Sequence, residues 1–283
     1  MPFANVNSVR LNYEVLGSKG PFVALVSGAR RNMDEVRGLA TLVADAGFQV
    51  LLHDRRNTGR SSLSLEGEGS EFEIWADDLR ALAQTLGLPP LMVGGSSSGC
   101  RLATIMALRH RDAIRALLMM RVTGGAFAVR RLSRVYYGQY IEAVQRGGME
   151  EVCRTDHFRD LIAIDPSRRA QIMAWHQEHF LEVMRRWQAG LESGIDDPML
   201  GASARALRTI DFPVCVLPGN DNTHSIAAGL GVHKLIPGAE LHQLRTDQLD
   251  VDLIPMSEWV SDKVLAPVVT GFFHRASVAA DAL

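Results

Sequence analysis

Short apolar segments alternate with amphipathic segments through the first half of this chain. Four apolar runs predict strands that are buried on both faces, at residues 22–28, 48–54, 90–95 and 114–121. Helical spacing of apolar residues follows the first three runs, at residues 33–47, 71–87 and 97–111. Alternation at this spacing is typical of a parallel sheet whose strands are joined by crossover helices.

The alternation is interrupted in the middle of the chain. Between residues 122 and 207 only helical periodicity is found, and strand-like runs return at residues 212–219 and 239–244 before a last helix. We therefore predict an α/β core of residues 1–121 and 208–283, with a mostly parallel sheet and helices on both of its faces. Residues 122–207 are predicted to form a helical cap inserted over one end of that sheet.

The composition excludes several classes of protein. Of 283 residues, 47% are hydrophobic, and 30 basic and 32 acidic residues give a formal net charge of −2. This balance gives no attraction to nucleic acid or to an anionic membrane, and no apolar run is long enough to span a bilayer. We therefore expect a small-molecule substrate and no nucleic-acid or membrane partner, and we leave a homodimer open.

The cysteines and the N-terminus indicate the compartment. Cys100, Cys153 and Cys215 are far apart, which argues against a disulfide framework or a zinc site and fits a reducing environment. The N-terminal segment has no basic region followed by an apolar run, so we expect no signal peptide. A cytoplasmic protein without a metal is the resulting expectation.

Residues 95–99, Gly-Ser-Ser-Ser-Gly, fit the pattern G-x-S-x-G between a predicted strand and a predicted helix. In this context a tight turn raises the central serine, Ser97, above the sheet edge, and the turn needs small neighbours because adjacent chains press against it. Ser97 would then lie at a helix N-terminus, where the dipole and free N–H groups stabilise an oxyanion. The alternative is a structural helix cap, since serine is a preferred cap residue. The lengths of strand, turn and helix favour a nucleophile.

Three further segments extend this pattern over most of the chain. They are LVSGARRN (25–32), at the place of an H-G-x oxyanion loop; HDRRNTGRSS (53–62), similar to D-R-x-G-x-G-x-S; and VCVLPGNDNTHS (214–225), similar to a strand and loop that carry a catalytic acid. Together with the serine turn, they make the chain resemble the α/β-hydrolase superfamily. The resemblance implies the α/β-hydrolase fold, a Ser…Asp…His order, and oxyanion donors in the backbone N–H groups of Ala29 and Ser98. Independently of it, the sequence contains no dinucleotide fingerprint, phosphate loop or metal cluster, so no cofactor is expected.

The triad that this resemblance implies is not complete at its usual positions. The acid usually lies three residues after the glycine of VLPG, where this chain has Asn222; Asp221 directly precedes it and is the expected acid. Asn222 could orient an imidazole but could not stabilise its charged form. The region that usually carries the histidine, residues 243–259, contains none. An atypical triad is therefore expected, in which another group accepts the proton of Ser97.

His224 is the best-placed replacement, since it lies in the loop of the expected acid, close to Asp221. If this loop folds inward, the imidazole approaches Ser97. The alternative, which the helix beginning at Ser225 favours, is that His224 caps that helix or packs under the cap. His53, at the end of a strand on the same side of the sheet, is a second candidate for the cavity; otherwise it is a buried hydrogen-bonding partner of the arginine-rich loop that follows it.

Two arginines and the cap indicate how a substrate would bind. Arg30 and Arg31 directly follow the oxyanion loop. They either clamp a substrate carboxylate or form ion pairs with Asp34 or Glu35. The cap is rich in aromatic residues and methionine, so we expect an apolar pocket between cap and sheet and an apolar or aromatic substrate.

Three functions fit these residues. The favoured one is a serine hydrolase of a small apolar or aromatic ester, lactone or ketone C–C bond, with Ser97 as nucleophile and a non-standard base. The second is a non-hydrolytic lyase or isomerase that uses the same oxyanion pocket, with Asp252 or another carboxylate of the last loop as base. The third is a catalytically weak binding protein for a small ligand. An imidazole within hydrogen-bonding distance of Ser97 Oγ favours the first, and a carboxylate there favours the second.

Overall fold

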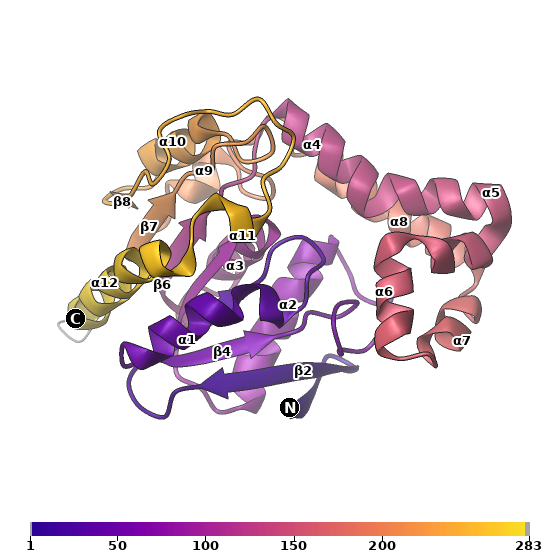
Figure 1. Cartoon of the computed structure of the whole chain (residues 1–283), viewed down its shortest axis with the longest axis horizontal. Helices are drawn as coiled ribbons and strands as arrows, with labels where there is room; N and C mark the ends of the chain where they lie inside the picture. The colour runs from indigo at the N-terminus through magenta and orange to yellow at the C-terminus, as the bar shows by residue number, and fades with distance from the viewer. Residues whose placement is uncertain (1, 281–283) are drawn as a thin grey trace.

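The computed structural model describes residues 2–280, and an eight-stranded sheet forms its core (Figure 1). The strands are β1 (Phe3–Val6), β2 (Val9–Leu16), β3 (Phe22–Val26), β4 (Gln49–His53), β5 (Leu91–Ser96), β6 (Ile114–Met120), β7 (Val214–Leu217) and β8 (Glu240–Leu241). Their order across the sheet is β1-β2-β4-β3-β5-β6-β7-β8. The strand β2 is antiparallel to both of its neighbours, and the strands from β4 to β8 pair in parallel. The predicted, mostly parallel sheet is confirmed.

Helices cover both faces of the sheet (Figure 1). On one face α1 (Arg37–Asp45) packs against α12 (Asp262–Ala280), and on the other α2 (Glu71–Thr85) packs against α3 (Ser98–Arg109). Successive side chains of a strand point to opposite faces, so Val50 and Leu52 of β4 join the apolar layer under α1 and α12, while Leu51 joins the other layer. Because both faces of the strands are buried, their side chains are apolar at successive positions, and the sequence shows continuous apolar runs.

A block of helices lies between β6 and β7 in the chain and beside the core in space (Figure 1). It consists of α4 (Ala126–Ser133), a π-helical turn (Arg134–Gly138), α5 (Gln139–Arg154), α6 (Asp156–Ile164), α7 (Arg168–Met173), α8 (Gln177–Glu192) and α9 (Ala204–Leu207). Buried aromatic side chains from these helices, among them Tyr140, Phe180 and Trp187, pack on one another inside the block. The helical insertion that the interrupted alternation predicted is present.

The carboxyl-terminal part differs from the expectation in two places. The strand β8 is shorter than the predicted segment 239–244, and the last helix is preceded by a short helix, α11 (Met256–Trp259). Beyond β8, residues 247–254 form hydrogen bonds with the loop that joins β7 to α10 (Ile226–Leu235). The backbone N–H groups of Asn222 and Thr223 donate to the carbonyl oxygens of Val251 and Asp252. Among residues 2–280, no helix combines the length and the apolar character needed to cross a membrane.

Candidate active site

Ser97 lies between β5 and α3 with a positive φ of 57° and a ψ of −117°. Such a conformation costs a non-glycine residue about 1–3 kcal/mol and persists only where the surroundings enforce it. The flanking glycines permit it. A Cβ on Gly95 would lie 2.4 Å from the carbonyl carbon of Gly99, and a Cβ on Gly99 would lie 2.2 Å from the carbonyl oxygen of Val26. The spacing of small residues around Ser97 therefore has a direct steric origin.

The imidazole of His224 lies beside Ser97. Its Nε2 is 2.7 Å from Ser97 Oγ, and its Nδ1 is 2.9 and 3.1 Å from the two carboxylate oxygens of Asp221. His224 and Asp221 are both fully buried. The side chain of His224 does not cap α10, because Ser225 is the cap residue and accepts a hydrogen bond from the backbone N–H of Ala228. The loop after β7 thus folds inward and places an imidazole between Ser97 and a carboxylate.

The carboxylate of Asp221 accepts several hydrogen bonds besides that of the imidazole. Its Oδ1 accepts from the backbone N–H groups of Thr223 and His224, at 3.0 and 2.8 Å. Its Oδ2 accepts from the backbone N–H of Ile254 at 3.0 Å and from the guanidinium of Arg121 at 2.9 Å. Burial raises the pKa of Asp221, but the bond to His224 and the other donors outweigh burial and hold this pKa well below its usual value. Asp221 is therefore an anion at neutral pH.

This anion determines which nitrogen of His224 carries the proton. Because a carboxylate only accepts, Nδ1 must donate to Asp221, which leaves Nε2 as the acceptor for the hydroxyl of Ser97. Burial lowers the pKa of His224 to about 4; the hydrogen bond to Asp221 opposes this shift, and the cation of Arg121 reinforces it. The imidazole is therefore neutral at pH 7 and able to accept a proton.

Sequence reasoning missed Arg121, which belongs to this cluster. It follows β6 with a positive φ of 52° and is buried. Its Nη2 donates to Asp221 and to the carbonyl oxygen of Ile254, and it lies 3.2 Å from His224 Nδ1. The available signal was a charged residue at the end of an apolar run, on the sheet edge where the carboxyl ends of parallel strands meet.

The loop 28–31 lies on the other side of Ser97, and its peptide orientation is defined. The carbonyl oxygen of Gly28 accepts from the backbone N–H of Arg31 and from Nη2 of Arg55, each at 3.1 Å. In a trans peptide the N–H points opposite to the carbonyl, so the N–H of Ala29 points away from Arg55. Gly28, Ala29 and Ser97 all line one cavity. This orientation is compatible with the oxyanion role expected for Ala29.

Arg55 holds this loop in place, and it too was missed. Its guanidinium is buried and donates to the carbonyl oxygens of Gly28, Ala29 and Arg31 and to Ser98 Oγ, at 2.8–3.2 Å. Burial lowers the pKa of Arg55 to about 10, which leaves it cationic at neutral pH. One buried cation therefore ties the loop 28–31 to the first residue of α3.

The cavity over Ser97 has a volume of about 530 Å³. Its polar wall includes Arg31, Asn32, Asp34, Glu35 and Arg121; its apolar wall is formed by residues 253–256 of the loop after β8. Of the two arginines expected to bind a substrate, only Arg31 lines this cavity, and it is exposed.

Arg30 is turned away from the cavity and pairs with neither Asp34 nor Glu35. Its guanidinium donates to both carboxylate oxygens of the buried Glu71, at 2.6 and 2.8 Å, and to the carbonyl oxygen of Tyr136. The Arg30 guanidinium carbon lies within 6 Å of four aromatic ring centroids, those of Trp75, Tyr136, Tyr137 and Tyr140. The region around Arg30, between α2 and the inserted helices, is therefore filled by a buried ion pair and aromatic rings.

Three other residues considered from the sequence are not brought to Ser97. His53 is buried and neither of its ring nitrogens has a hydrogen-bond partner, so it does not bind the arginine-rich loop either. The side-chain amide of Asn222 donates to the carboxylate of Asp250, 2.9 Å away. The carboxylate of Asp252 is exposed, lies 4.0 Å from Arg131 Nε and borders a different groove.

Within residues 2–280, one group of side chains could hold a metal ion. The sulfur of Cys215, the carboxylate of Glu240 and the imidazole of His242 lie within 4.8 Å of one another at the β8 edge of the sheet. The carboxylate of Glu240 is already engaged, because it accepts from Arg275 at 3.0 Å and lies 3.2 Å from His242 Nε2. None of these residues lines the cavity over Ser97.

Known proteins resemble this chain in sequence over part of its length and in structure over nearly all of it. The family model for the alpha/beta hydrolase fold matches residues 21–136. An uncharacterized hydrolase of Bacillus subtilis is 31% identical over 113 residues, which are 40% of this chain and 41% of that protein. The chain thus matches less than half the length of this curated relative.

Two solved structures extend the comparison. An enol-lactonase from Burkholderia xenovorans matches with a TM-score of 0.65 and 20% identity over 96% of this chain and 100% of its own. A meta-cleavage product hydrolase from Pseudomonas fluorescens matches with a TM-score of 0.65 and 18% identity over 98% of each chain. At these identities the likeness concerns the fold, including the helices between β6 and β7.

Proposed function

Because this chain belongs to the α/β-hydrolase superfamily and has its fold, we propose that it is a serine hydrolase with Ser97 as nucleophile, His224 as general base and Asp221 as the acid. The observation that carries the proposal is the 2.7 Å distance between His224 Nε2 and Ser97 Oγ. In this arrangement base and acid come from one loop, three residues apart, after β7. The missing histidine of the last loop is thereby replaced.

The proposed mechanism is acyl transfer in two steps. As Ser97 Oγ attacks the carbonyl carbon of the substrate, His224 Nε2 takes its proton, and the buried anion of Asp221 stabilises the imidazolium. The backbone N–H groups of Ala29 and Ser98 stabilise the tetrahedral oxyanion. His224 then gives the proton to the leaving oxygen, and the same imidazole activates the water that releases the acyl group. A general base positioned in this way typically increases the reaction rate by about 10²–10⁴-fold.

The proposed substrate is a small ester or lactone with an apolar or aromatic group. A cavity of about 530 Å³ suits a small molecule, and residues 253–256 offer an apolar wall for its acyl or aryl part. The exposed guanidinium of Arg31, which also lines this cavity, is suited to a substrate carboxylate. The fold likeness to an enol-lactonase and to a meta-cleavage product hydrolase adds lactones and ketone C–C bonds to the substrates that should be tested.

The two other functions have less support. A lyase with Asp252 as base requires that carboxylate near Ser97, but Asp252 lies 4.0 Å from Arg131 and borders another groove. A protein that only binds its ligand has no need for a neutral imidazole hydrogen-bonded to a strained serine, and such strain is typical of functional sites.

The proposal is tested by intact mass spectrometry after incubation with a fluorophosphonate. One adduct is expected on the wild type and none on Ser97→Ala, and labelling of His224→Ala should be at least about 10²-fold slower. Ser96→Ala is the matched control, because Ser96 borders the same cavity and its buried Oγ has no hydrogen-bond partner. Hydrolysis of short p-nitrophenyl esters and of aliphatic lactones then ranks the substrates. Equal labelling of His224→Ala and the wild type would remove His224 from the mechanism.

A further inference from the structure

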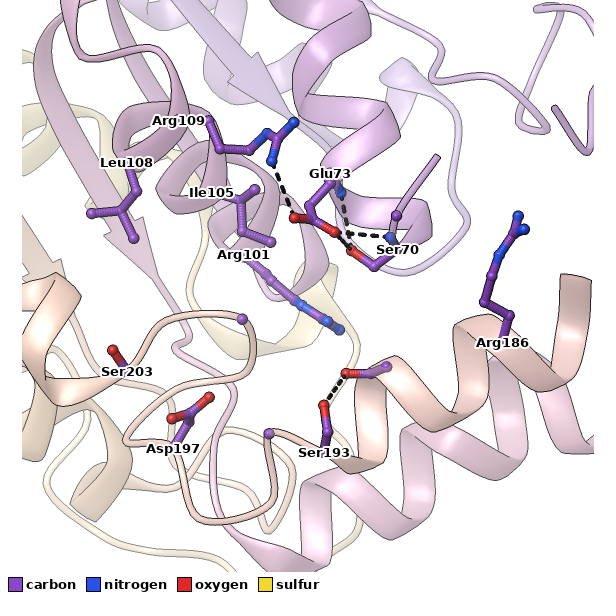
Figure 2. Close-up of a pocket in the computed structure, with 14 residues that line it drawn as sticks. Ser70, Glu73, Arg101, Ile105, Leu108, Arg109, Arg186, Ser193, Asp197 and Ser203 are labelled. Atoms are coloured by element: carbon purple, nitrogen blue, oxygen red, sulfur yellow. Dashed lines mark hydrogen bonds and ion pairs between the residues drawn. The ribbon is translucent and has the colours of Figure 1, made fainter. Parts of the chain in front are cut away.

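A second cavity, of about 510 Å³, lies between the core and the inserted helices (Figure 2). Its walls are the outer face of α3, the beginning of α2, the end of α8 and the loop 193–203. It shares no lining residue with the cavity over Ser97. The proposed hydrolase chemistry therefore does not account for it.

Arg101 projects into this cavity from the first turn of α3 (Figure 2). The residue is only 4% exposed, and its Nε and Nη1 have no hydrogen-bond partner. The guanidinium carbon lies 3.9 Å from the centroid of the Phe72 ring, which covers one side of the cation. Gly201, with a positive φ of 84°, also lies close to the guanidinium: a Cβ there would lie 3.2 Å from Arg101 Nε. The backbone at Gly201 therefore leaves little space beside the Arg101 guanidinium.

Arg101 differs in this respect from the other arginines that are buried within residues 2–280. Arg56 and Arg121 donate to the carboxylates of Asp78 and Asp221, and Arg55 and Arg168 donate to rows of backbone carbonyl oxygens. Burying a cation without such partners costs several kcal/mol. Burial lowers the pKa of Arg101 and outweighs the charges of Glu71 and Glu73, which favour the cation. Because Nε and Nη1 also lack acceptors, these donors are available to an anion that is not part of this chain.

The remaining polar groups of the cavity include both signs of charge. Arg109 and Arg186 add positive charge, and Glu73 and Asp197 add negative charge. The carboxylate of Glu73 is engaged, since it accepts from the backbone N–H of Ser70 and from Arg109.

Two further polar residues, Ser203 and Asp197, line the cavity. Ser203 Oγ accepts from the backbone N–H of Ala206, which leaves its own proton able to donate to a ligand. Asp197 borders the cavity without providing a hydrogen-bond partner for Arg101 Nε or Nη1. The hydrogen-bond donors in the cavity that lack an acceptor therefore belong mainly to cationic side chains.

We propose that this cavity is a binding site for a small oxyanion, a phosphate or a carboxylate group, with Arg101 as its main contact. A planar guanidinium matches the oxygen pairs of either group. Arg186 and Ser203 would contribute from the side of the inserted helices, and Ile105 and Leu108 of α3 would contact an apolar part of the ligand. A bound anion would then link α3 to α8 and to the loop 193–203, and so hold the inserted helices to the core.

The test is thermal unfolding of the full chain in inorganic phosphate, acetate or succinate, each against sodium chloride at equal ionic strength. A specific site predicts a saturable gain, in which the Tm rises by about 2 °C for each tenfold increase of the anion above its Kd. A response to phosphate assigns a phosphate group, and a response to the carboxylates alone assigns a carboxylate. An equal rise in sodium chloride, or no rise with any of the anions at 10 mM, would overturn the proposal.

Variants place the response at this cavity. Arg101→Gln should abolish the anion-dependent rise, whereas Arg146→Gln, the same change at an exposed position of α5, should retain it. The main alternative is that Asp197 itself serves as the counterion of Arg101, and the variant Asp197→Asn distinguishes the two. If the cavity binds an anion, removing the negative charge of Asp197 removes a repulsion and should lower the Kd of the anion. An unchanged or higher Kd in Asp197→Asn would contradict the proposed site. If Arg101→Gln does not fold, Arg186→Gln and Ser203→Ala take its place, and both must raise the Kd.

Discussion

The position of Arg121 predicts that its charge, together with burial, extends activity to lower pH by lowering the pKa of His224. Its Nη2 lies 3.2 Å from Nδ1 of His224, so its charge opposes the imidazolium that forms during the reaction. For charge centres about 5 Å apart and an effective dielectric constant of about 20, the repulsion is about 3 kcal/mol, or about 2 pKa units. Removing the cation in Arg121→Gln should therefore raise the pKa of His224 from about 4 to about 6.

The assay is kcat/KM for an activated ester between pH 3.5 and 9. Only the neutral imidazole accepts a proton, so kcat/KM rises with pH through the pKa of His224 in the free enzyme. We expect the wild type to reach its plateau by about pH 5 and Arg121→Gln only near pH 7. Arg121→Lys keeps the cation and should keep the midpoint close to that of the wild type, and Arg146→Gln controls for a general change of net charge. An unchanged midpoint in a folded Arg121→Gln protein would refute the electrostatic reasoning.

Three further predictions follow from other contacts. Arg55→Met releases the carbonyl oxygens of the loop 28–31, so kcat for ester hydrolysis should fall by about 10²–10³ with little change in KM; a loss confined to KM would contradict a role in positioning the oxyanion donors. Gly99→Ala places a Cβ 2.2 Å from the carbonyl oxygen of Val26, so both the Tm and fluorophosphonate labelling of Ser97 should decrease, and an unchanged Tm would show that the turn is less constrained than these distances indicate. Burial lowers the pKa of His53 from 6.5 to about 3. Between these two pH values the unfolded state binds a proton that the folded state does not, so the free energy of unfolding decreases as the pH falls. His53→Leu removes this effect, so in urea titrations at pH 7 and pH 5 the variant should lose less free energy of unfolding than the wild type.

Local patterns in the sequence were sufficient for the fold and for the serine turn. Continuous apolar runs separated by amphipathic helices specify a parallel sheet covered on both faces, because burial acts on every side chain of such strands. The turn at Ser97 is equally local, since the glycines at 95 and 99 are required by contacts with the adjacent strand and with each other. The long helical insertion was visible for the same reason: its periodicity of 3.6 needs no knowledge of distant residues.

The identity of the base could not be decided in this way. The sequence shows Asp221 and His224 three residues apart, but it also allows His224 to cap α10. In the inward-folded loop, the carboxylate of Asp221 accepts hydrogen bonds from Arg121 at the end of β6 and from Ile254 in the loop after β8. Arg121 is 100 residues from Asp221 along the chain.

The partners of the buried arginines were beyond sequence reasoning for the same physical reason. Arg30 was expected to pair with a nearby acid, yet its partner, Glu71, is 41 residues away. A buried cation takes whichever acceptors the packed elements bring to it, and a residue's neighbours in sequence do not determine these. Short-range patterns along the chain were therefore enough to predict the sheet, the inserted helices and the serine turn. The charged and polar groups that meet at Ser97 could be identified only from the folded protein, because their contacts form between strand ends and loops that are distant along the chain.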